Sequence, residues 1–153
     1  MISKKTKYGL QALLILAREH GRGPILIAEL AERDRIPKKF LESILLQLKN
    51  AGILGSRKGK GGGYFLARDP SQITMGRAVR VLEGPLAPVP CVSETAYQKC
   101  QECDDEASCG IRLVMKDVRD AIADILDHTT LQEVVARSSA ATRIFRQVID
   151  YQI

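Results

Sequence analysis

The most constraining feature of the sequence is a glycine-rich stretch between two short strand-like pieces, placed directly after three helix-like segments. The stretch reads ILGSRKGKGGGYFLAR over residues 53–68. Its glycines at 59 and 61–63 permit positive φ angles and a close approach to another backbone, so the segment predicts a β-hairpin. A phosphate-binding P-loop would need a helix after the glycines, and a strand-like piece follows instead.

Apolar residues recur with helical spacing in the three segments before this hairpin. Ser3 is placed to cap a first helix that runs to about His20, and ILIAELAERDRI predicts a short second helix. A third helix begins at Pro37, with its apolar stripe at positions 41, 44, 45 and 48. Three helices followed by a hairpin is the order of a winged helix–turn–helix, whose third helix enters the major groove of DNA.

The charge distribution favours the same interpretation. Residues 1–70 contain 14 Lys and Arg against 6 Asp and Glu, whereas residues 71–153 contain 9 against 12. The basic residues of the first half cluster at the start of the first helix, at the start of the third and on the hairpin: Lys4, Lys5, Lys7, Lys38, Lys39, Arg57, Lys58 and Lys60. These are the points at which a winged helix meets double-stranded DNA, so we expect DNA rather than an unrelated role for three solvated clusters.

The second half of the chain predicts a stalk and a loop. A fourth helix is expected over 74–84, with Thr74 as its cap, and a long helix from Cys109 to about His128. Apolar residues in that long helix step by 4, 3, 4 and 3, as in a coiled-coil seam: Ile111, Met115, Val118, Ile122 and Ile125. We therefore expect a dimerisation helix, although packing within one chain remains the alternative. TTLQEVV predicts a short helix, capped by Thr129 or Thr130, before a weakly amphipathic tail.

All the cysteines of the chain lie between the fourth and the long helix, with the spacing C-x8-C-x2-C-x5-C: Cys91, Cys100, Cys103 and Cys109. Four thiolates saturate either common iron–sulfur cluster, [2Fe–2S] or [4Fe–4S], and also suit zinc. A metal-free thiol switch, in which Cys100 and Cys103 form a disulfide, is the third alternative. The chain shows no secretory signal and no apolar run of membrane length, so a cytoplasmic location is expected.

Other functional classes fit less well. The two histidines, His20 and His128, lie at predicted helix ends far in sequence from the cysteines, and no catalytic grouping emerges, so the chain is not expected to be an enzyme. A small cluster-carrying electron-transfer protein would explain the cysteines, and it would leave the basic first half unexplained.

Several stretches resemble the IscR/NsrR/CymR type of bacterial winged-helix transcriptional regulators, the Rrf-type family. They are KKTKYGLQALLILA, FLESILLQLKNAGIL, RKGKGGGYFLARDPSQIT, RVLEGP and CGIRLVMKDVRDAIADILDHTTL, and they span nearly the whole chain to about residue 136. The resemblance implies a homodimer that binds a roughly palindromic operator and acts as a repressor or activator. By position, it implies that Glu42 and Ser43 read bases, with Lys39 beside them, and that Lys58 enters the minor groove.

The resemblance also bears on the cysteines. Cluster-sensing members use three cysteines here, and Cys91, Cys103 and Cys109 match that pattern, whereas Cys100 is additional. A histidine ligand of [2Fe–2S] members is replaced by Arg112, which stays protonated and cannot ligate a metal. Tyr8 stands where some relatives supply a carboxylate. Cys100 is therefore the expected fourth ligand, unless the fourth position stays open.

Together these features predict a mainly α fold: a winged helix–turn–helix head with a β-hairpin wing, and a long dimerisation helix. The division is a DNA-binding domain over 1–84, a cluster-binding loop over 85–109, a dimerisation helix with a short helix over 110–136, and a tail over 137–153. The expected function is a regulator sensing redox, iron, iron–sulfur status or nitric oxide through the cluster. The alternatives are a zinc-bound or thiol-switch regulator, or a CymR-like regulator controlled by a protein partner.

Overall fold

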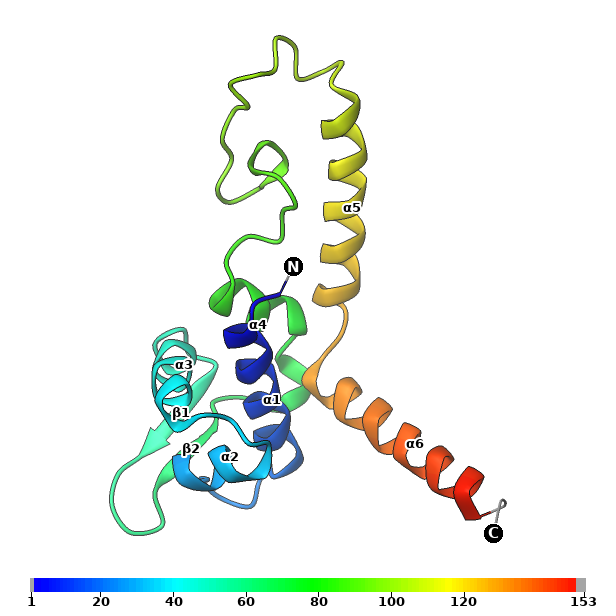
Figure 1. The fold of residues 1–153 in the computed structure, drawn as a ribbon. Coiled ribbons are helices and arrows are strands. Elements are labelled where there is room, and N and C mark those ends of the chain that lie inside the picture. The colour runs from blue at the N-terminus through cyan, green and yellow to red at the C-terminus, as the bar shows by residue number, and fades with distance from the viewer. Residues whose placement is uncertain (1, 151–153) are drawn as a thin grey trace.

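The computed structural model describes residues 2–150 and shows a compact head from which two long helices project (Figure 1). The head contains four helices and one hairpin: α1 Lys4–Arg18, α2 Ile27–Arg33, α3 Lys38–Asn50, β1 Leu54–Arg57, β2 Gly63–Leu66 and α4 Met75–Leu82. Two short 3-10 helices, Pro70–Gln72 and Pro90–Val92, precede and follow α4. The predicted order of elements is confirmed, and the helices differ from the predicted bounds by a few residues at their ends.

Two of the predicted helix caps are formed. The side chain of Ser3 accepts a hydrogen bond from the backbone N–H of Thr6, and that of Thr74 accepts one from the N–H of Arg77. Such bonds satisfy backbone donors that the first turn of a helix leaves without a partner. Pro37 lies one residue before α3, as its N-cap, rather than inside its first turn.

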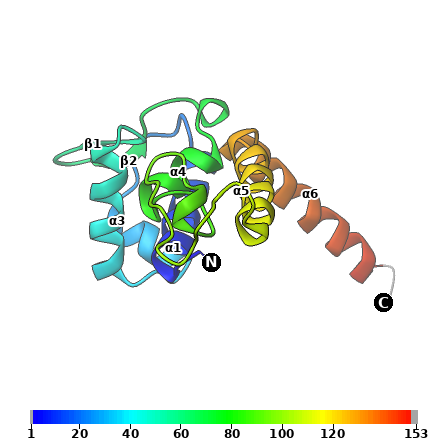
Figure 2. The ribbon, with the colours of Figure 1, turned by 90° about the horizontal axis from the view of Figure 1, so that it is seen from above.

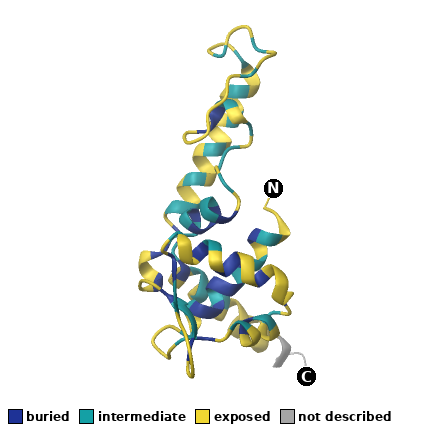
Figure 3. Ribbon diagram, turned by 90° about the vertical axis from the view of Figure 1, so that its left-hand side faces the viewer, coloured by how far each residue is buried: buried dark blue, intermediate teal, exposed yellow. Residues whose placement is uncertain are grey.

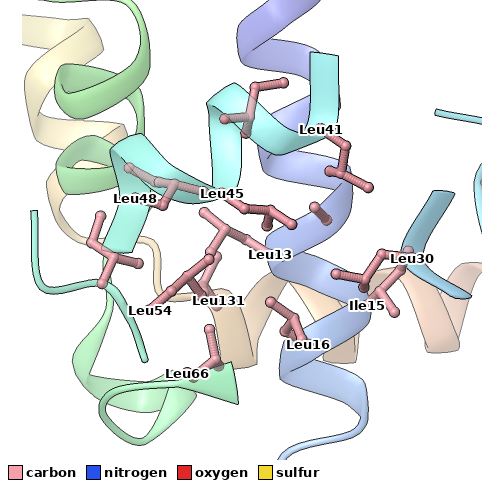
Figure 4. Packing of buried hydrophobic residues seen from close by; sticks show 14 of the residues in the cluster. Leu13, Ile15, Leu16, Leu30, Leu41, Leu45, Leu48, Leu54, Leu66 and Leu131 are labelled. Atoms are coloured by element: carbon pink, nitrogen blue, oxygen red, sulfur yellow. The ribbon is translucent and has the colours of Figure 1, made fainter. Parts of the chain in front are cut away.

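The core of the head is built from the apolar stripes of α1 and α3 (Figure 4). The predicted stripe of α3 is fully buried: Leu41, Ile44, Leu45 and Leu48. Leu13 from α1 lies against this stripe, and Leu131, the first residue of α6, is also fully buried in the same cluster. The start of α6 is therefore part of the head core.

The hairpin pairs β1 with β2 in antiparallel register, from Leu54 opposite Leu66 to Arg57 opposite Gly63. It is also joined to the loop before α2, because Tyr64 exchanges both backbone hydrogen bonds with Ile25 at 2.8 and 2.9 Å. The predicted positive φ angles are present at Gly59, Gly61 and Gly63 but not at Gly62, where an added Cβ would instead lie 2.3 Å from the carbonyl oxygen of Arg57. The close backbone approach expected of the glycines is confirmed.

The long helix α5, Gly110–Asp127, runs away from the head and contains no buried residue (Figure 3). One finding corrects the sequence analysis: the expected short helix and tail are a single helix, α6 Leu131–Asp150. Residues 151–153 of the predicted tail lie outside the described part. Within residues 2–150, no helix has the length and apolar character needed to span a membrane.

Candidate functional site

The outer face of α3 carries the residues expected to read DNA. Lys38, Lys39, Glu42 and Ser43 are all exposed on the face opposite the buried leucine stripe. Phe40 lies on this face as well, and its side chain is 53% exposed. Sequence periodicity did not single out Phe40, because an apolar residue beside a buried stripe reads as part of the core.

Side-chain bonds qualify two of the predicted contacts. The hydroxyl of Ser43 donates to the Phe40 carbonyl of the same helix at 3.0 Å. Its proton is therefore already used, and its oxygen can still accept a hydrogen bond from another group. The Nζ of Lys5 donates to Oε1 of Gln47 at 2.6 Å and ties α1 to α3. Lys5 therefore has a structural contact within the head, whereas Lys4 and Lys7 are exposed.

The hairpin and α3 lie on the same side of the head. Figures 1 and 2 both place α3 and the hairpin opposite α5 and α6. Arg57, Lys58 and Lys60 are exposed at the hairpin, and the ring of Tyr8 in α1 lies 6.3 Å from that of Phe40. The structure thus places the α3 and hairpin clusters on one side of the head, and the contact of Tyr8 with Phe40 joins α1 to α3.

The four cysteines share one cavity beside the first turn of α5. Figure 1 shows that this end of α5 is remote from the head. The cavity has a volume of about 290 Å³, and charged side chains line it beside the thiols: Lys99, Glu106 and Arg112. All four cysteines are free and half-buried. Residues that are separated by up to 18 positions in the sequence therefore meet in one place.

Cys103 and Cys109 differ in their environments. Cys109 is the N-cap of α5, and the backbone N–H of Arg112 is the main cause that lowers the pKa of its thiol. The pKa of Cys103 is raised, first by burial and then by its hydrogen bond to Cys109. The charge of Glu106 is only a minor cause of the raised pKa of Cys103.

The donor set suits a thiolate-bound metal group, because cysteine sulfur is the preferred ligand of iron–sulfur clusters and of structural zinc. Among residues 2–150, however, no three His, Cys, Asp or Glu side chains are already arranged around a single ion position. The residues fit such a group in kind and in sharing a cavity. Ligation would require the segment over 91–109 to draw its sulfurs closer together.

Comparison with known proteins decides the class. The profile of the Rrf2 family, described as iron-dependent transcriptional regulators, matches residues 2–137. The chain belongs to the Rrf2 family. An rrf2-like helix–turn–helix regulator of Rhodobacter capsulatus is 42% identical over 147 residues, which cover 94% of this chain and 98% of that protein.

Solved structures of Rrf2 proteins superpose over most of the chain. CymR of B. subtilis, described as its global cysteine regulator, has a TM-score of 0.75 at 35% identity and covers 90% of this chain and 97% of its own. IscR of T. potens has a TM-score of 0.74 at 30% identity, with 92% and 90% covered. These Rrf2 structures confirm the predicted winged-helix fold.

The Rrf2 assignment makes this chain a transcriptional regulator of a DNA-binding, non-enzymatic family. The TM-scores to CymR and IscR are nearly equal, whereas sequence identity is higher to CymR of B. subtilis, at 36%, than to IscR of Sodalis glossinidius, at 29%; the fold alone therefore does not select between their modes of control. The signal that this Rrf2 chain senses therefore has to be inferred from its cysteine cavity.

Proposed function

We propose that the chain is a homodimeric regulator whose cysteines bind an iron–sulfur cluster, and whose operator affinity depends on that cluster. The observation that carries the proposal is the single cavity lined by all four cysteines. When bound, such a cluster responds to iron supply, oxidants or nitric oxide by changing its oxidation state or by being lost. Zinc is the alternative occupant for the same donors.

The residues of the cavity have distinct parts in this proposal. Cys91, Cys103 and Cys109 are the expected ligands, and Cys100 is the expected fourth. The lowered pKa of Cys109 favours its thiolate, the form that ligates a metal. Because the sulfurs are not arranged around one point, binding would rearrange the segment over 91–109 to bring them together, and this rearrangement would link the signal to α5.

Anaerobic purification tests the cluster directly. We expect visible charge-transfer absorption together with iron and acid-labile sulfide. Replacing Cys91 or Cys109 by Ser should abolish the absorption, whereas a Cys100→Ser variant that keeps it would reduce the ligand set to three. Bound zinc without sulfide would support the zinc alternative, and protein without either metal would overturn the proposal.

The stalk supports the proposed dimer. Apolar side chains of α5 are largely exposed in the single chain, including Ile111 at 70%, Val114 at 57% and Ile125 at 63%. A second copy of the chain is the proposed cover, because the apolar residues follow a heptad seam. An Ile122→Glu variant should sediment as a monomer at concentrations where the wild type and a Lys116→Glu control are dimers.

The DNA contacts can be sorted by salt dependence. Over an operator titration, Lys58→Ala should weaken binding to all sequences and reduce the salt slope by about one unit. Glu42→Ala should instead relax the sequence preference with little change in slope. Residues 1–84 would then be the DNA-binding domain, and the sign of regulation would follow from operator position.

A thiol switch is the second candidate, favoured by the cavity that Cys103 and Cys109 share and by the lowered pKa of the Cys109 thiol. This pair differs from the pair expected from sequence, Cys100 with Cys103. Peroxide would accept two electrons and two protons from the two thiols, forming one S–S bond and two waters. A metal-free wild type that gains a Cys103–Cys109 disulfide under peroxide, seen by mass spectrometry, would favour this candidate.

A further inference from the structure

Two arginines of α5 contact the beginning of the cysteine segment. Arg112 and Arg119 are seven residues apart, which is about two helical turns, so they lie on one face of the helix. Nε of Arg112 donates to the carbonyl of Cys91 at 3.3 Å, and Nη1 of Arg119 donates to the carbonyl of Val92 at 2.7 Å. Two successive carbonyls are therefore held by two cationic donors.

Arg112 joins both ends of the cysteine segment. Its side chain donates to the backbone carbonyl of Cys91, while its own backbone lies in the first turn of α5, which begins directly after Cys109. The segment beside Cys91 is firmly packed, since Val92 is only 3% exposed and Ser93 only 7%. Hydrogen bonds from a charged donor are stronger than neutral ones, so this arrangement favours a closed segment even without a bound group.

Arg112 differs from Arg119 in facing the thiols. Arg112 lines the cysteine cavity, and its charge contributes to the lowered pKa of Cys109. Arg119 contacts Glu94 and Asp120, and it lines a separate, smaller cavity. The acidic Glu106 also lines the cysteine cavity, where its carboxylate accepts from the hydroxyl of Tyr97 at 2.7 Å.

We propose that Arg112 and Arg119 form a clamp that positions the Cys91 end of the segment, and that Arg112 also compensates the charge of an anionic thiolate-bound group. Arg112 is a positioning residue, since it cannot ligate a metal. The clamp stands on the contacts described above, whereas the charge role rests on the proposed function. The two parts are tested separately.

Hydrogen exchange of the metal-free protein tests the clamp. We expect Arg112→Gln and Arg119→Gln each to speed exchange in the segment over 91–98 by about tenfold, because loss of a charged hydrogen bond makes local opening easier. Lys116→Gln is the matched control: it removes the same charge from an exposed site on the same helix, and it should leave exchange unchanged. Wild-type exchange in both arginine variants would overturn the clamp.

Cobalt titration tests the charge role, because Co²⁺ reports thiolate ligation by its absorption. Arg112→Gln should weaken Co²⁺ binding by about tenfold, while Arg112→Lys and Lys116→Gln should stay within about threefold of the wild type. Equal affinity in Arg112→Gln and Arg112→Lys would overturn the charge role. If the wild type gives no thiolate absorption, the charge role fails together with the proposed metal site, and the exchange data still decide the clamp.

Discussion

Gly63 is fitted to the head so closely that no side chain is accommodated. Its φ angle is +137°, and a Cβ atom placed there would lie 2.3 Å from the backbone oxygen of Ile25. Ile25 is the residue that pairs with Tyr64, so the glycine permits the hairpin to join the head. The glycine run is therefore explained by contact as well as by turn geometry.

Replacing Gly63 by alanine should destabilise the protein by about 3 kcal/mol, because strain in the backbone adds to a clash with a main chain that cannot move freely. Gly61→Ala is the control. Gly61 also has a positive φ of +73° but has open space around it, so about 1 kcal/mol is expected. Thermal and denaturant unfolding measure both, and equal losses would show that the close approach to Ile25 is unimportant.

Glu83 caps the start of α1 from a distance of 80 residues in the sequence. One of its carboxylate oxygens accepts from the backbone N–H of Ser3 at 3.0 Å and from the hydroxyls of Ser3 and Thr6. These donors, with Thr6 first, lower the pKa of Glu83 to about 2 from 4.5. The charged form is thus favoured by folding.

The lowered pKa predicts a pH dependence of stability. A carboxyl with a depressed folded-state pKa contributes fully above about pH 4.5, and the contribution is lost as pH falls toward 2. The melting temperature of Glu83→Gln should therefore lie below that of the wild type at pH 6, and the gap should close between pH 4.5 and 2. Glu102→Gln changes a carboxylate on the exposed loop and is the control, whose melting temperature should match that of the wild type. A difference between Glu83→Gln and the wild type that stays constant with pH would contradict the capping role of the charged Glu83.

At the scale of elements, α6 begins with a reciprocal capping box. The Thr130 backbone N–H donates to the Glu133 carboxylate at 2.7 Å, and the Glu133 N–H donates to the Thr130 hydroxyl at 3.2 Å. The residue that follows the cap is Leu131, which lies fully buried in the head core. The cap therefore sets the point at which the chain leaves the head.

Thr130→Ala should reduce stability by about 1 kcal/mol, the usual cost of losing an N-cap. Thr142→Ala provides the comparison, since the Thr142 hydroxyl donates back to the Ser138 carbonyl within the same helix and that bond adds little. Urea unfolding followed by circular dichroism would distinguish them. An effect of Thr142→Ala as large as that of Thr130→Ala would refute the capping role.

Sequence patterns predicted the head and α5 better than they predicted α6, because the long helix expected from Cys109 to about His128 is observed as Gly110–Asp127. Helical spacing, caps and glycines are local signals, and they located α1, α3, α4 and the hairpin to within a few residues. In α6 the apolar residues Ile144, Phe145 and Val148 are exposed, so no packed stripe marks the helix. The absence of Gly and Pro between Leu131 and Asp150 was the available signal for its length.

The site was predictable in its residue types but not in its pairings. Spacing indicated four cysteines in one loop, whereas the contact of Cys103 with Cys109 depends on how α5 begins. The arginine contacts to Cys91 and Val92 were equally hidden, because they join positions 21 and 27 residues apart. Such long-range contacts depend on the fold and produce no periodic pattern in the sequence.

At the scale of the whole molecule, the cysteine cavity and the head, which carries the proposed DNA contacts, lie at opposite ends of α5, whose length is about 27 Å at 1.5 Å per residue. One ion pair joins the head end of this helix to α4: Nη2 of Arg80 lies 2.8 Å from Oδ2 of Asp127, with a second contact between Nη1 and Oδ1. The pair lowers the pKa of Asp127. Helix α4 in turn reaches α3, because the carbonyl of Val81 accepts from Nε2 of Gln47 at 2.5 Å.

If the cysteine segment controls DNA binding, this junction is the route on which the control depends within one chain. Asp127→Asn should cost about 1 kcal/mol, as expected for a partly exposed bidentate pair, so the protein remains folded. The ratio of operator affinities between cluster-loaded and cluster-free protein should fall at least threefold toward one, because α5 and α4 no longer move together.

Asp124→Asn makes the same charge change one turn earlier, where the carboxylate faces His128, and it should keep the wild-type ratio. Fluorescence anisotropy with both forms of each variant measures the ratio, and an unchanged ratio in Asp127→Asn would assign the coupling to the dimer contact of α5 instead.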